Sequence, residues 1–421
     1  MPVLFDKRDQ SLLKIVNDII EGGKPLTGEE RRYFAQLHPR GIKELAETRG
    51  LRIAYAVIHI LESLEVGKYE DRLSALQSLR DEVLNASTGP LPKNAARVLL
   101  EIMKELVRSH GDYRRQLKLA HDFRITAAGK PGMVRRQLRK YHLLEMSEEW
   151  NQLSFDDHVH DVNTKGRKSA THLIMDAWIK GINELRVIYY NYIEPRSAAE
   201  LLEAAEIMGI SVRIGIEMLS AFRGRLIKLI WTPRGFSGTH GFLHFLNEPQ
   251  VQEVMEEGRE VSEYQEQYIL DMLELFNKKH RPAINECFGI ELRPISTEKF
   301  MAFVGTGQAS LLHLAKFIHN RLHPLFKDKV SELRESPGQM SAEKSKRTEE
   351  LVEEMNRLNP EKIRKNYIAP EVNSELPDPE MVPTGEDIPE MLQKPPKKLL
   401  ERLSELRSEE RRVGKECATG C

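Results

Sequence analysis

Between residues 155 and 322, short apolar segments alternate with amphipathic helical patterns, and this alternation restricts the fold more than any other feature of the sequence. Segments rich in β-branched and aromatic residues predict strands. They span 155–159, 185–191, 212–218, 226–232 and 299–304, with a weaker one at 290–295. Helices are predicted over 170–181, 197–208 and 308–322. Strands that alternate with helices are typical of βαβ units, so we expect a parallel sheet or a β/α barrel.

The number of predicted strands limits the barrel interpretation. A closed β/α barrel has eight strands in about 250 residues, whereas residues 151–330 predict about five. We therefore expect an α/β fold in which this region is a partial, TIM-like β/α barrel that lacks its later strands. An open doubly wound sheet is the competing architecture. A long acidic segment, 248–285, is predicted to be a helical insertion in this domain.

The regions on either side of the β/α domain have different patterns. Residues 1–150 predict an all-α N-terminal domain, because helical periodicity recurs at 11–20, 51–64, 69–84 and 94–107 between glycine and proline breakers. Residues 331–406 contain nine of the 21 prolines and neither Phe nor Trp, so they offer little apolar surface to offset the entropy lost on ordering. We expect a mostly disordered linker there, with transient helix at 343–358 and 397–406.

Residues 407–421 are interpreted as foreign to the protein. Residues 407–417 resemble the in-frame translation of a common sequencing-adaptor oligonucleotide, and a solvated charged tail is the alternative. On the first interpretation Cys417 and Cys421 are not native and Cys287 is the remaining cysteine. The chain is then a fragment, and we expect the missing C-terminal part of the same protein to be its partner.

Composition excludes several classes of protein. A net charge of -1 gives no overall attraction to nucleic acid or to a membrane surface. A mean hydropathy of -0.47, without an apolar run of about 18 residues, argues against a membrane span. The N-terminus lacks the layout of a secretory signal, and three cysteines cannot form a disulfide framework. We therefore expect a cytoplasmic protein.

Two histidines at the end of the first predicted strand are the strongest candidates for a functional site. His158 and His160 are two residues apart, so their side chains point to the same face of a strand. Active sites of β/α folds lie at the carboxyl ends of the strands. Neutral imidazoles bind zinc, manganese or iron, and the neighbouring carboxylates of Asp156 and Asp161 are candidates to orient them. The alternative is a pair of surface-loop histidines without a ligand.

Three motifs extend this observation beyond the histidine pair. Asp156, His158 and His160 match the pattern Asp-x-His-x-His, and a helix with the pattern Ala-x-x-x-Gly follows at 177–181. A third pattern, Gly-Ile-x-Val-x-x-Gly-Ile-Glu, spans 209–217. In these motifs the sequence from 156 to 218 resembles the first third of a polymerase and histidinol phosphatase (PHP) domain, a superfamily of metal-dependent phosphoesterases. The resemblance implies a divalent metal held by the two histidines and by Glu217.

The sequence also departs from the family pattern. The family's second strand ends in Thr-Asp-His, whereas this one ends in Tyr-Tyr-Asn, and the histidine often found on the fourth strand is absent. The implied metal site is therefore degenerate, incomplete or both. In an active site of this type, metal-bound water would attack a phosphate ester. Asn191 would then position the substrate. Arg234, which follows the fourth strand, is a candidate phosphate contact, with a structural turn as the alternative.

A basic segment, 104–141, departs from the overall neutrality. It contains eleven Lys and Arg against three Asp and Glu, interleaved with Tyr113, Phe123 and Tyr141. Cations with interleaved aromatic rings are typical of nucleic-acid surfaces, although a solvated helix face has the same composition.

Two functional hypotheses follow from these observations. The first is a metal-dependent phosphoesterase of the PHP type that acts on a phosphorylated small molecule or a nucleic acid. The second is a non-catalytic binding or regulatory β/α module, which contacts nucleic acid through residues 104–141. The histidines and Glu217 favour the first, and the loss of Thr-Asp-His favours the second.

Overall fold

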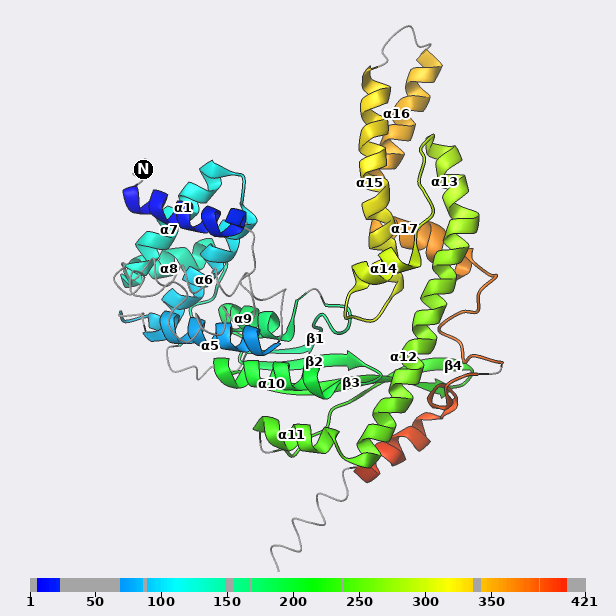
Figure 1. Ribbon diagram of the computed structural model, residues 1–421, viewed down its shortest axis with the longest axis horizontal. Helices are drawn as coiled ribbons and strands as arrows, with labels where there is room; N and C mark the ends of the chain where they lie inside the picture. The colour runs from blue at the N-terminus through cyan, green and yellow to red at the C-terminus, as the bar shows by residue number, and fades with distance from the viewer. Residues whose placement is uncertain are drawn as a thin grey trace, which may run out of the picture.

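The structure is a computed structural model that combines many helices with one small sheet. It describes residues 6–22, 69–85, 89–147, 154–166, 168–236, 238–335, 342–385 and 387–406. Five helices gather at one end of the molecule (Figure 1): α1 (Lys7–Gly22), α5 (Tyr69–Asn85), α6 (Pro92–Arg108), α7 (Tyr113–Ala127) and α8 (Pro131–Lys140). The helix predicted over 51–64 and the segment 407–421 lie outside the described residues.

The sheet lies in the middle of the molecule and has the order β1-β2-β3-β4. Its strands are β1 (Phe155–Val159), β2 (Glu184–Tyr190), β3 (Ser211–Phe222) and β4 (Arg225–Trp231). The first three are parallel, as predicted, and they are connected by α9 (Ala170–Lys180) and α10 (Pro195–Met208). Gly181 and Gly209 end these helices in the left-handed conformation, at φ 81° and 67°.

The fourth strand runs in the opposite direction to the one predicted. β3 and β4 form an antiparallel hairpin whose two turn residues, Arg223 and Gly224, both have positive φ. Such a turn matches the twist of the two strands. The unit β3-β4 is therefore a hairpin and not a further βαβ crossover, so the described residues form a four-stranded mixed sheet.

Helices follow the sheet as far as residue 335. They are α11 (Gly238–Leu246), α12 (Pro249–Leu275), the π-helical turn η1 (Phe276–His280), α13 (Arg281–Phe288), α14 (Thr297–Val304) and α15 (Leu311–Glu335). The expected insertion over 248–285 is helical. The strand predicted at 299–304 is wrong, because these residues form α14, capped by the Ser296 side chain. The weaker strand at 290–295 is also wrong, because this segment is an irregular connection.

The disordered linker expected over 331–406 is not what the described residues form. Residues 342–406 contain α16 (Ala342–Arg357), α17 (Pro360–Ile363), the turns η2 (Arg364–Ile368), η3 (Pro370–Val372) and η4 (Glu390–Gln393), and a helix at 396–406. Many of their aliphatic side chains are buried, including Ile363, Ile368, Met391 and Leu399. The low aromatic content suggested disorder, but these aliphatic residues provide the apolar surface that ordering requires.

Residues 377–385 and 387–394 lie beside the hairpin, which they extend at Glu380 and Met381. Their backbone forms an antiparallel bridge between Met381 and Arg225, and the Leu226 N–H donates to the Glu380 carbonyl at 2.8 Å. Further on, the Ala221 N–H donates to the Lys394 carbonyl at 3.0 Å. Lys394 also forms an ion pair of 3.1 Å with Glu257 on α12. We refer to residues 377–385 and 387–394 as the C-terminal strap.

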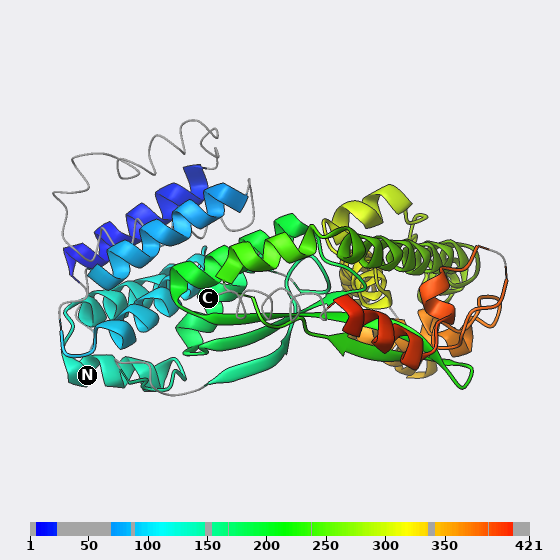
Figure 2. The same cartoon turned by 90° about the horizontal axis from the view of Figure 1, so that it is seen from below.

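Two hydrophobic clusters stabilise the fold, and α12 contributes to both. The first joins α1 and α5–α10 to the sheet, the start of α12 and Leu399. The second contains the end of α12 and helices α13–α17. Figure 1 shows α12 passing the sheet toward α13, and Figure 2 shows the N-terminal helices and the late helices at opposite ends of the molecule. The described part of residues 1–150 therefore shares its core with the sheet instead of packing around a separate one.

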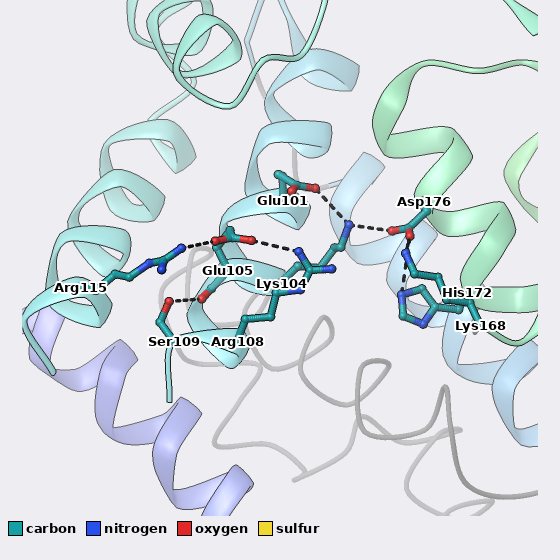
Figure 3. A network of polar contacts seen from close by, with 9 residues as sticks. All are labelled: Glu101, Lys104, Glu105, Arg108, Ser109, Arg115, Lys168, His172 and Asp176. Atoms are coloured by element: carbon teal, nitrogen blue, oxygen red, sulfur yellow. Dashed lines mark hydrogen bonds and ion pairs between the residues drawn. The ribbon is translucent and has the colours of Figure 1, made fainter. Parts of the chain in front are cut away.

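A polar network also connects α6 with α9 (Figure 3). The Nζ of Lys104 lies 2.7 Å from Oδ1 of Asp176, and the Nζ of Lys168 forms an ion pair with Oδ2 of the same carboxylate. The side chain of His172 lies against this carboxylate as well. Burial and the neighbouring lysines lower the pKa of His172 to about 3. The imidazole therefore stays neutral in the folded protein at neutral pH.

We expect the free energy of unfolding to fall as the pH decreases from about 6.5 toward 4. In this range His172 takes up a proton in the unfolded chain but not in the folded protein, because folding lowers the pKa of the His172 imidazole. The cost is about 1.4 kcal/mol per pH unit for one such proton. Replacing His172→Gln should make the pH dependence of the urea midpoint shallower, whereas replacing the exposed His244→Gln should not. An unchanged slope for His172→Gln would contradict the buried neutral ring.

Candidate functional site

Side chains from all four strands converge where the parallel strands end. Tyr190 and Glu217 are in register on β2 and β3, and their side chains lie on the same face of the sheet. The ring of His160, just after β1, lies 5.1 Å from the ring of Tyr190. Lys228 on β4 places its ammonium 6.0 Å from the centroid of the same ring. The structure therefore brings His160 and Glu217 to the same edge of the sheet, as predicted for a β/α site.

The two histidines form a close pair. Their Nε2 atoms are 3.1 Å apart, and the Nδ1 of His160 donates to the Ile188 carbonyl at 2.9 Å. Because a carbonyl oxygen can only accept a hydrogen bond, the Nδ1 of His160 carries the proton. In the neutral ring, Nε2 is then unprotonated and has the lone pair that could bind a metal. Burial and nearby Lys165 lower the pKa of His160 to about 4, which keeps the ring neutral at neutral pH. Two nitrogens bound to one zinc ion at 2.0–2.1 Å would be about 3.3 Å apart, so the spacing of this pair fits two ligands of one metal.

Glu217, the third expected ligand, is paired with a lysine. Its Oε1 lies 2.8 Å from the Nζ of Lys228, and its side chain is only 10% exposed. The ammonium thus supplies the positive charge that a carboxylate in this position requires. Across the part of the chain that the structure describes, no three His, Cys, Asp or Glu side chains are grouped as a metal site. The two imidazoles are therefore spaced as ligands of one metal, whereas Glu217, the third ligand that the PHP resemblance implies, is paired with Lys228.

Asn191 has a structural role that the sequence did not indicate. It is buried, has a positive φ of 61°, and its amide donates to Ser262 and Gln265 on α12, both at 2.9 Å. Gly258, one turn before Ser262, lets the helix backbone approach the Asn191 carbonyl. The amide nitrogen is thus occupied by α12, which leaves the side-chain oxygen for a ligand.

The two carboxylates expected to orient the histidines bind other groups. Asp156 accepts the backbone N–H of His158, and Asp161 accepts the Tyr189 hydroxyl at 2.6 Å together with Asn163. Burial raises the pKa of Asp161, and these hydrogen bonds favour its charged form. Asp161 therefore fixes the loop after β1, and in the described structure neither carboxylate contacts an imidazole.

Arg234 lies away from this cluster. β4 runs antiparallel to β3, and its last residue, Trp231, pairs with Ile216 before the chain continues toward the amino ends of β1–β3. Arg234 follows that strand and is exposed. Arg234 is not among the residues that line the cavity beside the cluster, and its assignment as a phosphate contact stays a prediction.

A partly open cavity of about 1140 Å³ adjoins the cluster. Lys165, Tyr190, Asn191, Glu217 and Lys228 contribute to its wall from the strand ends. The rest of the wall comes from α12, from the start of α15, from residues 359–364 and from the C-terminal strap. Sequence reasoning missed Lys228, because its position beside Glu217 depends on the hairpin register.

The basic segment 104–141 is largely paired within the structure. Arg115, Arg124, Arg135 and Lys140 form ion pairs with Glu105, Asp9, Glu145 and Asp122, respectively. Phe123 is buried and the Tyr141 hydroxyl donates to Asp122, so of the three interleaved aromatic residues Tyr113 is the exposed one. These contacts reduce the cationic, aromatic surface that nucleic acid would require, and nucleic-acid binding here stays a prediction.

The described residues contain no helix that is both long and apolar enough to cross a membrane. The chain matches no model of a known protein family and no curated protein.

Proposed function

We propose that the chain is a non-catalytic binding module, built on a partial barrel of the PHP type, which holds a phosphorylated small molecule at the carboxyl ends of its strands. The ion pair between Lys228 and Glu217 carries this proposal. It puts an ammonium, on a side chain that is 66% exposed, beside the buried carboxylate that the PHP resemblance assigns to a metal. An ammonium can neutralise and hydrogen-bond a phosphate, but it does not activate water as a bound divalent metal does.

A second lysine supports binding of an anion at this position. The Lys165 ammonium lies 5.4 Å from the centroid of the Tyr190 ring, and Lys228 lies 6.0 Å from the same centroid. One carboxylate, Glu217, faces these two cations and the neutral imidazole of His160. Beside Tyr190 two ammoniums therefore accompany one carboxylate, whereas Arg364, Glu361 and Asp378 lie elsewhere on the cavity wall. A phosphate group would balance this local positive charge.

We expect Lys228→Met and Lys165→Met each to weaken the binding of inorganic phosphate by about tenfold or more, because each removes one charge-assisted hydrogen-bond donor. The measurement is isothermal titration calorimetry at low ionic strength. Arg234→Met provides a matched control, since Arg234 is exposed and does not line the cavity, so that its loss should leave binding unchanged. Equal affinities for wild type and Lys228→Met would contradict the proposal.

A metal-dependent phosphoesterase is the second candidate, and the 3.1 Å separation of the histidine Nε2 atoms favours it. A divalent metal such as zinc, manganese or iron would there polarise a phosphate ester. Elemental analysis of the purified protein separates the two functions. About one equivalent of metal, lost in the variant His158→Ala with His160→Ala, would support the enzyme, whereas a metal-free protein that binds phosphate would support the binding module.

A further inference from the structure

We infer that the ligand of this module is an amphiphile, with a phosphate at the strand ends and an apolar body that fills the rest of the cavity. This inference rests on the proposed function for the position of the phosphate. The apolar body is argued from the lining of the cavity.

Apolar side chains line the cavity on several of its sides. They come from the sheet, from α12, from the start of α15 and from the C-terminal strap, and include Leu226, Ile269, Leu311, Leu312, Met381 and Val382. Leu312 and Met381 are 41% and 43% exposed, which is high for large apolar residues. A ligand that removes these surfaces from water gains affinity in proportion to the apolar area covered.

The size of the cavity leads to the same conclusion. Its volume of about 1140 Å³ exceeds the range of roughly 300–1,000 Å³ that is usual for sites of drug-sized ligands. A phosphate group next to Lys228 would leave most of this space unfilled. The occupant must therefore extend well beyond its anionic end.

Tyr268 provides an independent observation. Tyr268 lines the cavity, and its hydroxyl is buried and has no hydrogen-bond partner in the part of the chain that the structure describes. Burial raises the pKa of this phenol to about 12, so the group is a neutral donor at physiological pH. Buried hydroxyls almost always have a partner, so a bound molecule or an ordered water is expected beside Tyr268.

The test compares three probes on the full chain by isothermal titration calorimetry: inorganic phosphate, decyl phosphate below its micelle concentration, and decanol. We expect decyl phosphate to bind about 100-fold more tightly than inorganic phosphate, because several methylene groups become buried. Leu312→Ser, at a partly exposed position of the wall, should weaken decyl phosphate several-fold and leave inorganic phosphate unchanged.

The outcomes distinguish the two proposals. Equal affinities for decyl phosphate and inorganic phosphate would contradict the inference that the ligand has an apolar body, and would leave the proposed phosphate site standing. A second result would contradict the proposed phosphate site and leave the apolar cavity standing. In that result decanol binds as tightly as decyl phosphate, and Lys228→Met does not change the affinity for decyl phosphate. Failure of all three probes to bind would overturn both.

Discussion

Gly258→Ala should lower the free energy of unfolding by about 2 kcal/mol or more, because α12 packs directly on the backbone after β2. A Cβ at this position would lie closer than 3.0 Å to the carbonyl oxygen of Asn191 and 2.7 Å from its carbon. Both are backbone atoms, so no side-chain rotation can relieve the clash. Either α12 or the loop at Asn191 must move.

A second glycine provides the control for this measurement. Gly132 lies in α8 with no atom within 4 Å of an added Cβ. Gly132→Ala should therefore stabilise the protein by about 0.5–1 kcal/mol, through helix propensity alone. Urea denaturation of both variants measures the difference. A Gly258→Ala variant that is as stable as the wild type would show that α12 does not sit against Asn191.

The same substitution should also affect binding. Asn191 is held from α12 by Ser262 and Gln265, and both Asn191 and Gln265 line the cavity. Displacement of the helix would change the shape of this wall, so we expect Gly258→Ala to weaken decyl phosphate binding under conditions in which the variant remains folded.

Arg97→Met should cost about 3 kcal/mol or more, because it removes a buried cation from a set of fixed acceptors. Arg97 is fully buried. Its Nε donates to the Ile179 carbonyl at 2.8 Å, and its Nη1 donates to the Leu144 carbonyl at 2.8 Å and to Asn94 at 3.0 Å. Methionine fills part of the volume but donates no hydrogen bond, which leaves two backbone carbonyls without this partner.

The control for Arg97 lies on the same helix. Arg108 is 56% exposed and pairs with Glu105 at 3.0 Å. Arg108→Met should change the free energy of unfolding by less than about 0.5 kcal/mol, since exposed ion pairs contribute little. Equal urea midpoints for the two variants would contradict the hydrogen bonds by which Arg97 connects α6 to Ile179 at the end of α9 and to Leu144.

Local sequence patterns were sufficient for the parallel part of the sheet. Segments rich in β-branched and aromatic residues located β1, β2 and β3, and helical periodicity located α9 and α10, because these signals depend only on neighbouring residues. The direction of β4 was missed, although Arg223 and Gly224 separate two strands by two residues, the length of a tight hairpin loop. The alternation of strands and helices earlier in the domain had favoured a further parallel strand.

The candidate site was predictable only in part. Strand periodicity placed His158 and His160 on one face, and their 3.1 Å approach agrees with it. Lys228 could not be found in the same way, because its contact with Glu217 depends on pairing between β3 and β4. Asn191 was assigned to substrate, yet its amide binds α12, a contact between residues more than seventy positions apart. Long-range contacts of this kind leave no local pattern.

The C-terminal strap determines when the cavity can exist during protein synthesis. The sheet and α12 are complete once residue 275 has been made, but Met381, Val382 and Leu392 supply part of the cavity wall. A nascent chain that has reached α15 therefore has its strand-end lysines without an enclosed volume beside them. A ligand that needs that wall cannot assist the early folding of the sheet, and the ability to bind it arises only after residue 392 has left the ribosome.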